Sequence, residues 1–162
     1  MQPLATMAGQ ARRAVRGVLA DIDDTITTHG ELTAPAYAAL ARLRAAGLRV
    51  VPITGRPAGW CDHIARMWPV DAVVGENGAF WMRYDGASRK LIKRFVADDA
   101  TRAANRARLA AVGEKILRAV PGTALASDQH YREADLAIDF CEDVPPLPRE
   151  AVDRIVALME AE

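Results

Sequence analysis

Apolar and polar positions follow one another in regular blocks over the first half of the chain. Three short apolar runs have the composition of buried parallel strands, and they occupy residues 15–23 (VRGVLADID), 48–54 (LRVVPIT) and 70–75 (VDAVVG). The segments between them, residues 33–47 and 56–67, have helical spacing, and Thr33 is a typical N-cap. This alternating order predicts an α/β fold with a Rossmann-like parallel core sheet and right-handed crossovers.

After Gly75 the pattern changes and predicts a mixed α+β block. A hairpin is expected around Asp85 and Gly86, followed by a helix over 98–120, strands at 122–127 and 134–140, and a last helix from 148. On the last helix, Val152, Ile155, Val156 and Met159 are expected to face inward. The predicted organisation is a flexible leader (1–14), a core (15–81), an α+β cap (82–147) and the last helix of the cap (148–162).

The first predicted strand runs directly into three aspartates, Asp21, Asp23 and Asp24. Residues two apart in a strand point to the same side, so Asp21 and Asp23 are expected to project together, with Asp24 solvated or capping. Two carboxylates suit Mg²⁺, and an aspartate can act as a covalent nucleophile on phosphorus. A second acid can protonate the leaving alcohol and then activate water, while Thr25 could hold the loop.

The second predicted strand ends in PITGRP, which offers groups that bind an anion. The Thr54 hydroxyl, the open backbone at Gly55 and the Arg56 guanidinium can all donate hydrogen bonds to a phosphate oxygen. The other interpretation of Arg56 is an ion pair with a carboxylate. The carboxyl ends of two neighbouring strands are therefore expected to bring acids and anion-binding groups together.

These motifs resemble those of the haloacid dehalogenase superfamily. DIDDT at 21–25 and ITGRP at 53–57 are similar to motifs I and II, and GENGAF at 75–80 is similar to the subfamily with a large α/β cap. That subfamily includes the sucrose-, trehalose- and mannosylglycerate-phosphate phosphatases and the Cof-type sugar phosphatases. The resemblance implies a Mg²⁺-dependent phosphatase acting on a phosphorylated sugar through an aspartyl-phosphate.

The same resemblance implies a role for individual residues. Asp21 would be the nucleophile and a Mg²⁺ ligand, and Asp23 would be the general acid/base whose backbone carbonyl also binds the metal. Thr54 would bind the transferring phosphoryl group, with Gly55 and Arg56 beside it. Asn77 would lie at the mouth between core and cap and contact the substrate, although the turn at Glu76 and Asn77 also has plain backbone reasons for its residues. The polar segment 127–135 would either meet the sugar or serve as an ordinary loop.

The sequence also departs from the family pattern. The family completes its site with a lysine and further acids after the cap, whereas residues 141–162 contain no lysine. We therefore expect an incomplete core sheet, an N-terminal part of a longer phosphatase, and an inactive or weak isolated chain. Three alternatives remain open: a compact site completed by Lys115 and Asp128, a phosphotransferase with the same intermediate, and a non-catalytic module that binds a phosphosugar or a partner.

The composition of the chain limits the classes of partner that it is expected to bind. Lysine plus arginine equals aspartate plus glutamate at 21 each, which disfavours nucleic acid and anionic membranes as partners, and no apolar run approaches the roughly 20 residues of a membrane span. The expected partner is a small-molecule phosphate ester. Cys61 and Cys141 lie far apart, which fits a reducing cytoplasm. Exposed core surface is expected to favour oligomerisation.

Overall fold

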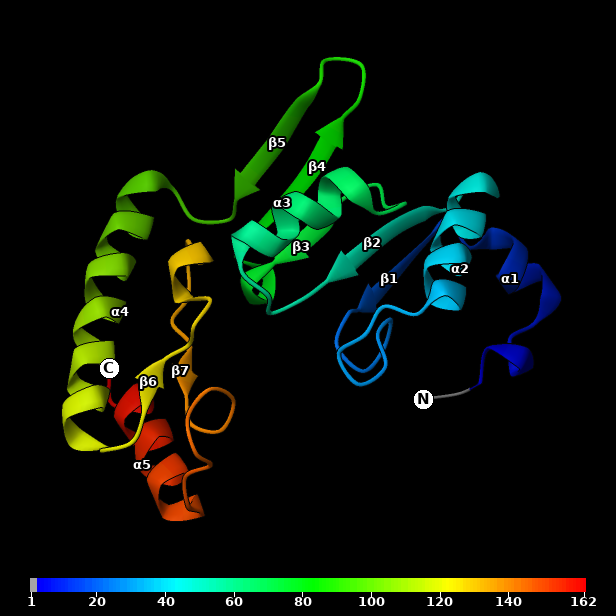
Figure 1. Cartoon of the computed structure of the whole chain (residues 1–162). Helices are drawn as coiled ribbons and strands as arrows, with labels where there is room; N and C mark the ends of the chain where they lie inside the picture. The colour runs from blue at the N-terminus through cyan, green and yellow to red at the C-terminus, as the bar shows by residue number, and fades with distance from the viewer. Residues whose placement is uncertain (1–2) are drawn as a thin grey trace.

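The computed structural model describes residues 3–162 and contains a five-stranded sheet in the order β1-β2-β3-β4-β5 (Figure 1). Its strands are β1 (Gly17–Asp21), β2 (Arg49–Ile53), β3 (Val73–Gly75), β4 (Phe80–Asp85) and β5 (Lys90–Phe95). The first three pair in parallel, whereas β4 and β5 are added in antiparallel fashion. The predicted α/β class with a parallel core is thus confirmed.

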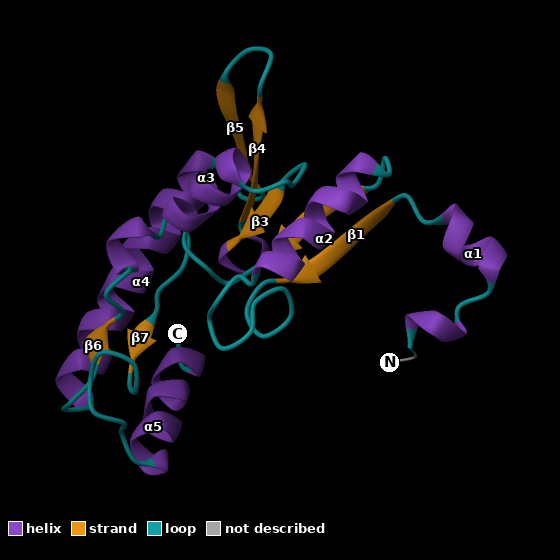
Figure 2. Cartoon of the chain, turned by 45° about the vertical axis from the view of Figure 1, so that its right-hand side comes forward, coloured by secondary structure: helices purple, strands orange, loops and turns teal. Residues whose placement is uncertain are grey.

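Two helices, α2 (Ala34–Ala45) and α3 (Ala58–Met67), pack against this sheet (Figures 1 and 2). The predicted N-cap of α2 is present, since the Thr33 hydroxyl accepts a hydrogen bond from the Ala36 N–H at 3.4 Å. The main core lies between the helices and one face of the sheet, and α3 contributes Cys61 and Ile64 to it. Burial of these side chains is the principal favourable term holding the helix on the sheet.

The opposite face of the sheet is largely uncovered. Leu19, Val51, Val74 and Trp81 share this face, because they are paired across the strands. The side chain of Leu19 is 67% exposed and that of Trp81 is 37% exposed, and β1 is an edge strand. Parallel sheets are normally covered on both faces. An uncovered apolar face that ends in an unpaired edge strand is therefore suited to contact with another protein surface.

The hairpin of β4 and β5 extends the sheet instead of belonging to the cap. Its register pairs Phe80 with Phe95, and Phe80 and Met82 are 1% and 2% exposed within the main core. The sequence-based limit between residues 81 and 82 therefore falls inside β4. The turn chemistry predicted the hairpin correctly, but it could not show that β4 pairs with β3. We propose residues 96–98 as the link between core and cap.

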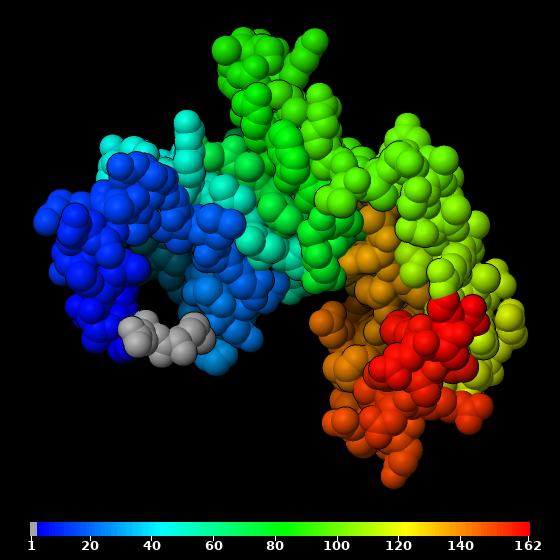
Figure 3. All heavy atoms as spheres, turned by 180° about the vertical axis from the view of Figure 1, so that it is seen from behind, coloured from blue at the N-terminus to red at the C-terminus, as the bar shows by residue number. Residues whose placement is uncertain are grey.

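The residues after this link, which we propose to be the cap, form a second unit with its own small core (Figures 2 and 3). It contains α4 (Asp99–Ala119), β6 (Ala124–Leu125), β7 (Ile138–Asp139) and α5 (Arg149–Glu160). Val112, Ile116, Val120 and Ile155 form the buried cluster. The two predicted cap strands are present but only two residues long each. Of the apolar positions expected to face inward on α5, Val156 and Met159 are 45% and 38% exposed, because α5 contacts α4 along a narrow stripe around Ile155.

The predicted leader contains short helical segments that the sequence analysis did not anticipate. Residues Leu4–Thr6 form a 3₁₀ turn (η1) and Gly9–Ala14 a short helix, α1, and neither contains a buried residue. Residues 1 and 2 of the predicted leader lie outside the described residues. Among residues 3–162, no helix combines the length and the apolar character that crossing a membrane requires.

Candidate functional site

The loop after β1 positions the aspartates. Asp21 is paired with Ile53 at the carboxyl end of the strand, and its side chain is exposed. Thr27 organises the loop: its hydroxyl donates to the Ile22 carbonyl at 3.0 Å and accepts from the Asp24 N–H at 3.3 Å. Asp24 adopts a positive φ of 55° and is exposed. The role expected for Thr25 is therefore filled by Thr27.

Asp23 and Arg56 form an ion pair across the two strand ends. The Nη2 of Arg56 donates to Oδ1 of Asp23 at 2.8 Å, and its Nε donates to Oδ2 at 3.2 Å. These bonds are the main cause of a raised pKa of Arg56. The guanidinium also lies over the Trp60 ring, 4.7 Å from its centroid. In this state Arg56 pairs with a carboxylate, as the alternative interpretation proposed, and both side chains remain partly exposed.

Thr54 is held rigidly beside this pair. Its side chain is only 2% exposed, and its N–H donates to the Val74 carbonyl at 2.9 Å. The Thr54 hydroxyl oxygen accepts a hydrogen bond from the Arg56 N–H at 3.0 Å. Because the hydroxyl acts as the acceptor in that bond, its own hydrogen remains available to donate to an anion.

The 3₁₀ turn η2 (Glu76–Gly78) lies directly against the loop that carries Thr54 and Gly55. The Asn77 N–H donates to the Thr54 carbonyl at 3.2 Å, and Asn77 adopts a φ of 55°. Its side-chain oxygen lies 3.0 Å from the position that a Cβ on Gly55 would occupy. Gly55 is therefore needed for close approach of the two segments, and Asn77 supports the loop that carries Thr54.

Glu76 is a buried carboxylate that joins three segments of the chain. It is 2% exposed, has a φ of 45°, and accepts five hydrogen bonds from four backbone N–H groups. One donor is Ala58 at the start of α3, at 2.9 Å. The other donors are Glu133, Ala134 and Asp135 of the cap. The sequence analysis assigned Glu76 only an ambiguous turn position.

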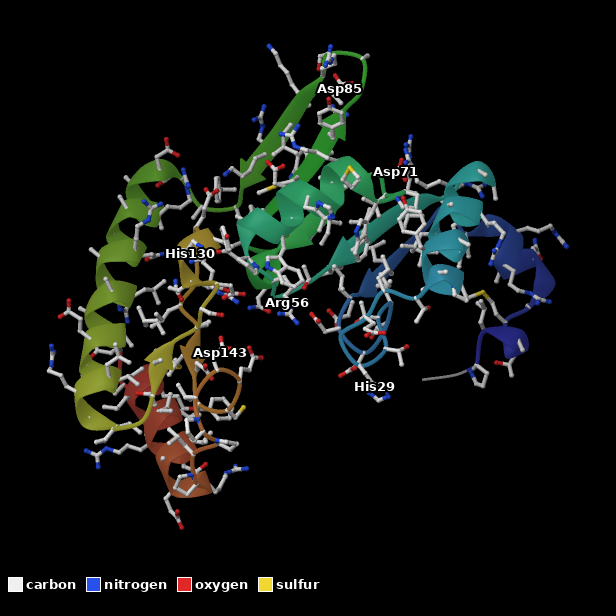
Figure 4. The ribbon with its side chains drawn as sticks, viewed as in Figure 1. His29, Arg56, Asp71, Asp85, His130 and Asp143 are labelled. Carbon is white, nitrogen blue, oxygen red and sulfur yellow. The ribbon has the colours of Figure 1, made fainter. Side chains whose placement is uncertain are left out.

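The polar cap segment 127–135 is docked on the core. Arg132 pairs with Asp128 at 3.1 Å and Asp135 at 2.9 Å, and its Nη1 donates to the Gly55 carbonyl at 3.1 Å. Tyr131, at the end of the 3₁₀ turn η3 (Gln129–Tyr131), packs against Gly59 of α3. Figure 4 shows Arg56 between the loop that carries His29 and the cap segment that carries His130. The charges of this segment are thus largely used to hold it beside the loop that carries Thr54, Gly55 and Arg56.

None of the described hydrogen bonds or ion pairs joins a lysine to Asp21 or Asp23. Lys115 pairs with Glu162, and Lys93 pairs with Glu133. Lys90 lies opposite Asp85 at the distal end of the hairpin. With Asp128 bound to Arg132, the structure offers no support for a compact site completed by Lys115 and Asp128.

The donors for a metal ion are also few. Within residues 3–162, no group of three or more His, Cys, Asp or Glu side chains could hold a metal ion. The exposed Asp21 carboxylate remains a suitable oxygen ligand, and Mg²⁺ in phosphoryl-transfer sites often takes one or two carboxylates with water and substrate phosphate. The residues present therefore fit part of a Mg²⁺ site.

Comparison with known proteins identifies one matching family and several solved structures that resemble this chain. The model of the haloacid dehalogenase-like hydrolase family matches residues 18–105, which is more than half of the chain and includes all six predicted site residues. A comparison with curated protein sequences found no significant match.

Solved structures resemble the chain at low identity. Protein 0175 of Thermoplasma acidophilum shares 17% identity over 91% of this chain and 57% of its own, with a TM-score of 0.67. The IMP-nucleotidase of Plasmodium falciparum shares 10% identity over 92% of this chain and 42% of its own, with a TM-score of 0.60. A haloalkanoate-superfamily phosphatase from Bacteroides thetaiotaomicron shares 20% identity, over 96% of this chain and 50% of its own, but its TM-score of 0.47 adds no weight. The chain spans about half the length of these proteins, and the first two confirm the fold.

Proposed function

The chain belongs to the family of haloacid dehalogenase-like hydrolases, and from this premise we propose that it carries the nucleophile-bearing part of a phosphatase site for small-molecule phosphate monoesters. The observation that carries the proposal is the meeting of two strand ends. An exposed Asp21 ends β1, while Thr54 and Arg56 follow the adjacent β2, with Arg56 bound to Asp23. Acids for chemistry and donors for an anion are thereby assembled at one edge of the sheet.

The geometry supports a two-step displacement. The Asp21 carboxylate attacks phosphorus, the bond from phosphorus to the ester oxygen breaks, and protonated Asp23 gives its proton to the leaving alkoxide. Asp23 then takes a proton from water, whose oxygen attacks the aspartyl-phosphate and releases inorganic phosphate. The Thr54 hydroxyl binds a phosphoryl oxygen throughout. An incoming phosphate competes with Asp23 for Arg56, which frees Asp23 for its proton transfers.

We propose Mg²⁺ as the cofactor, held by the Asp21 carboxylate and the Asp23 backbone carbonyl. When bound, the ion would reduce the electrostatic repulsion between the Asp21 carboxylate and a phosphate dianion. Family resemblance alone points to a phosphorylated sugar as substrate. We also propose a cytoplasmic location, because both cysteines are free thiols; the distribution of a tagged protein between cell fractions would test it.

We expect the native gene product to bind beryllium fluoride in the presence of Mg²⁺, because this phosphoryl analogue adds to an aspartate carboxylate. A bound resonance should appear in the ¹⁹F NMR spectrum. Asp21→Asn should abolish it, and Thr54→Val should weaken binding about tenfold through the loss of one hydrogen bond to a charged group.

Asp24→Asn is the matched control, because Asp24 is exposed one residue from Asp23, and asparagine tolerates its positive φ. This variant should bind the analogue normally. A bound resonance that persists in Asp21→Asn would refute Asp21 as the nucleophile. Binding of inorganic phosphate without beryllium fluoride trapping would favour a non-catalytic binding module.

We further propose that the uncovered sheet face mediates self-association through a second copy of the chain. Leu19 lies at the edge of this face, on the edge strand β1, and is 67% exposed. Leu19→Lys should shift the sedimentation profile toward monomer at high protein concentration, because a charge blocks both apolar packing and edge pairing. His29→Lys, on the exposed loop after β1, is the charge-matched control. Identical profiles for wild type and Leu19→Lys would exclude this surface.

A further inference from the structure

We infer that the alcohol part of the substrate is an uncharged, predominantly apolar ring group, bound in an aromatic pocket beside Asp23. The inference rests on the proposed phosphatase function, and for the substrate it replaces the phosphorylated sugar, which family resemblance alone suggested. The pocket has a volume of about 620 Å³ and lies between the loop after β1, helix α3 and the cap residue Tyr131. A pocket of this size accommodates an ordinary small-molecule ligand.

The position of the pocket identifies its occupant. Asp23 and Arg56 both line it, so it begins where the proton donor and the anion-binding guanidinium lie. A general acid must be within hydrogen-bond reach of the oxygen that it protonates. The group attached to that oxygen therefore extends from Asp23 into the adjoining space, which is this pocket.

The charge of the lining favours a neutral group. Among the described residues that line the pocket, Asp23 and Arg56 are the only Asp, Glu, Lys or Arg, and they are paired with each other. A second phosphate, a carboxylate or an ammonium group on the alcohol would lose hydration there without gaining an opposite charge. Burial of an unpaired charge is strongly unfavourable, so the lining selects against such substrates.

The hydrogen-bonding capacity of the lining disfavours a sugar with many hydroxyls. Thr27 lines the pocket, but its hydroxyl already donates to the Ile22 carbonyl and accepts from the Asp24 N–H. His63 and Tyr131 remain as polar side chains away from the ion pair. A pyranose brings several hydroxyls, each of which needs a partner when it leaves water. The lining offers too few.

The walls instead suit a flat apolar ring. Trp60 and Trp68 line the pocket together with Ile64 and Leu32. Trp60 is 47% exposed, and its ring lies under Arg56, which places an aromatic surface directly next to the anion-binding group. A ring attached to the phosphate can therefore contact Trp60 while the phosphate meets Arg56, and aromatic contacts add to the free energy of area burial.

Calorimetric titrations with four probes, in the absence of Mg²⁺, test the inference: 1-naphthyl phosphate, 1-naphthol, glucose 6-phosphate and inorganic phosphate. We expect 1-naphthyl phosphate to bind at least about tenfold more tightly than glucose 6-phosphate, because stacking on a tryptophan contributes substantially to affinity. Trp60→Ala should weaken binding of both naphthyl probes about tenfold and leave inorganic phosphate within about twofold.

Tyr84→Ala is the control, because Tyr84 is a partly exposed aromatic residue of β4 outside the pocket. It should leave all four affinities unchanged. Equal affinities for the sugar and naphthyl esters, or naphthyl binding unaffected by Trp60→Ala, would overturn the inference. Failure of inorganic phosphate to bind, with 1-naphthol still bound in a Trp60-dependent manner, would count against the proposed function and in favour of the pocket.

Discussion

Replacement of Glu76 by alanine should undock the cap from the core. The substitution removes the acceptor of five hydrogen bonds, and its four N–H donors come from Ala58, Glu133, Ala134 and Asp135. Each buried donor left without a partner costs about 1–3 kcal/mol, and partial access of water to the cap amides reduces the sum. We expect a total cost of about 4 kcal/mol, expressed first as release of the 127–135 segment.

Hydrogen exchange followed by mass spectrometry measures this release directly. Amides 133–135 should exchange up to about a thousandfold faster in Glu76→Ala, since about 1.4 kcal/mol corresponds to a factor of ten. Amides of β2, within the main core, should keep most of their protection. Glu76→Gln should have a smaller effect, because it keeps one carbonyl acceptor. Glu160→Ala, at an exposed position near the end of α5, serves as the control and should exchange as the wild type does.

The hydrogen-exchange experiment can also contradict the proposed role of Glu76. Unchanged protection of residues 133–135 in Glu76→Ala would mean that the remaining contacts, chiefly Arg132 with the Gly55 carbonyl, hold the cap without the carboxylate. Docking matters for the proposed site, because Tyr131 lines the pocket next to Asp23 and is carried by the same cap segment. Through its hydrogen bonds to this segment, the buried Glu76 side chain therefore helps to determine where Tyr131 lies relative to Asp23.

The sequence allowed the first half of the fold to be predicted because its signals are local. Apolar runs ending in polar residues define β1 and β2, and Thr33 caps α2 as its type suggests. The proximity of Asp23 to Arg56 follows from the parallel pairing of these strands, whose carboxyl ends meet at one edge. The placement of the candidate site was therefore predictable, whereas the chemical roles of its residues remain proposals.

The remaining features depend on contacts between distant segments. Glu76 receives four of its five hydrogen bonds from residues 57 to 59 positions later in the chain, so no local pattern indicates its role. In the cap, the apolar alternation at 134–140 predicted a long strand. Gln129 instead binds the Ala137 N–H at 2.8 Å, and Asp139 accepts from the Cys141 N–H at 3.0 Å. These side-chain bonds compete with the ladder and shorten β7 to two residues.

Replacement of Gly75 by alanine should destabilise the main core. A Cβ at this position would lie 2.4 Å from the Phe80 ring and 2.6 Å from the Cys61 sulfur, and neither neighbour is more than 1% exposed. The backbone at Gly75 has a φ of −117°, so steric overlap and not backbone strain is the cause. Overpacking of a close-packed core costs about 1–3 kcal/mol, and two simultaneous overlaps place the expected loss near 3 kcal/mol.

Urea unfolding of the variant against a matched glycine control measures this loss. Gly86→Ala adds the same methyl group in the hairpin turn, where no atom lies within 4 Å of the new Cβ, and should change the free energy of unfolding by less than about 0.5 kcal/mol. Phe80→Leu removes the nearest ring atoms, so Gly75→Ala should cost less in that background than in the wild type. Equal costs in both backgrounds would show that Phe80 is not the obstacle. A loss of the same size in Gly86→Ala would show that the overlap at Gly75 is not its cause, because the restriction of the unfolded chain by alanine is equal at both positions and by itself raises stability.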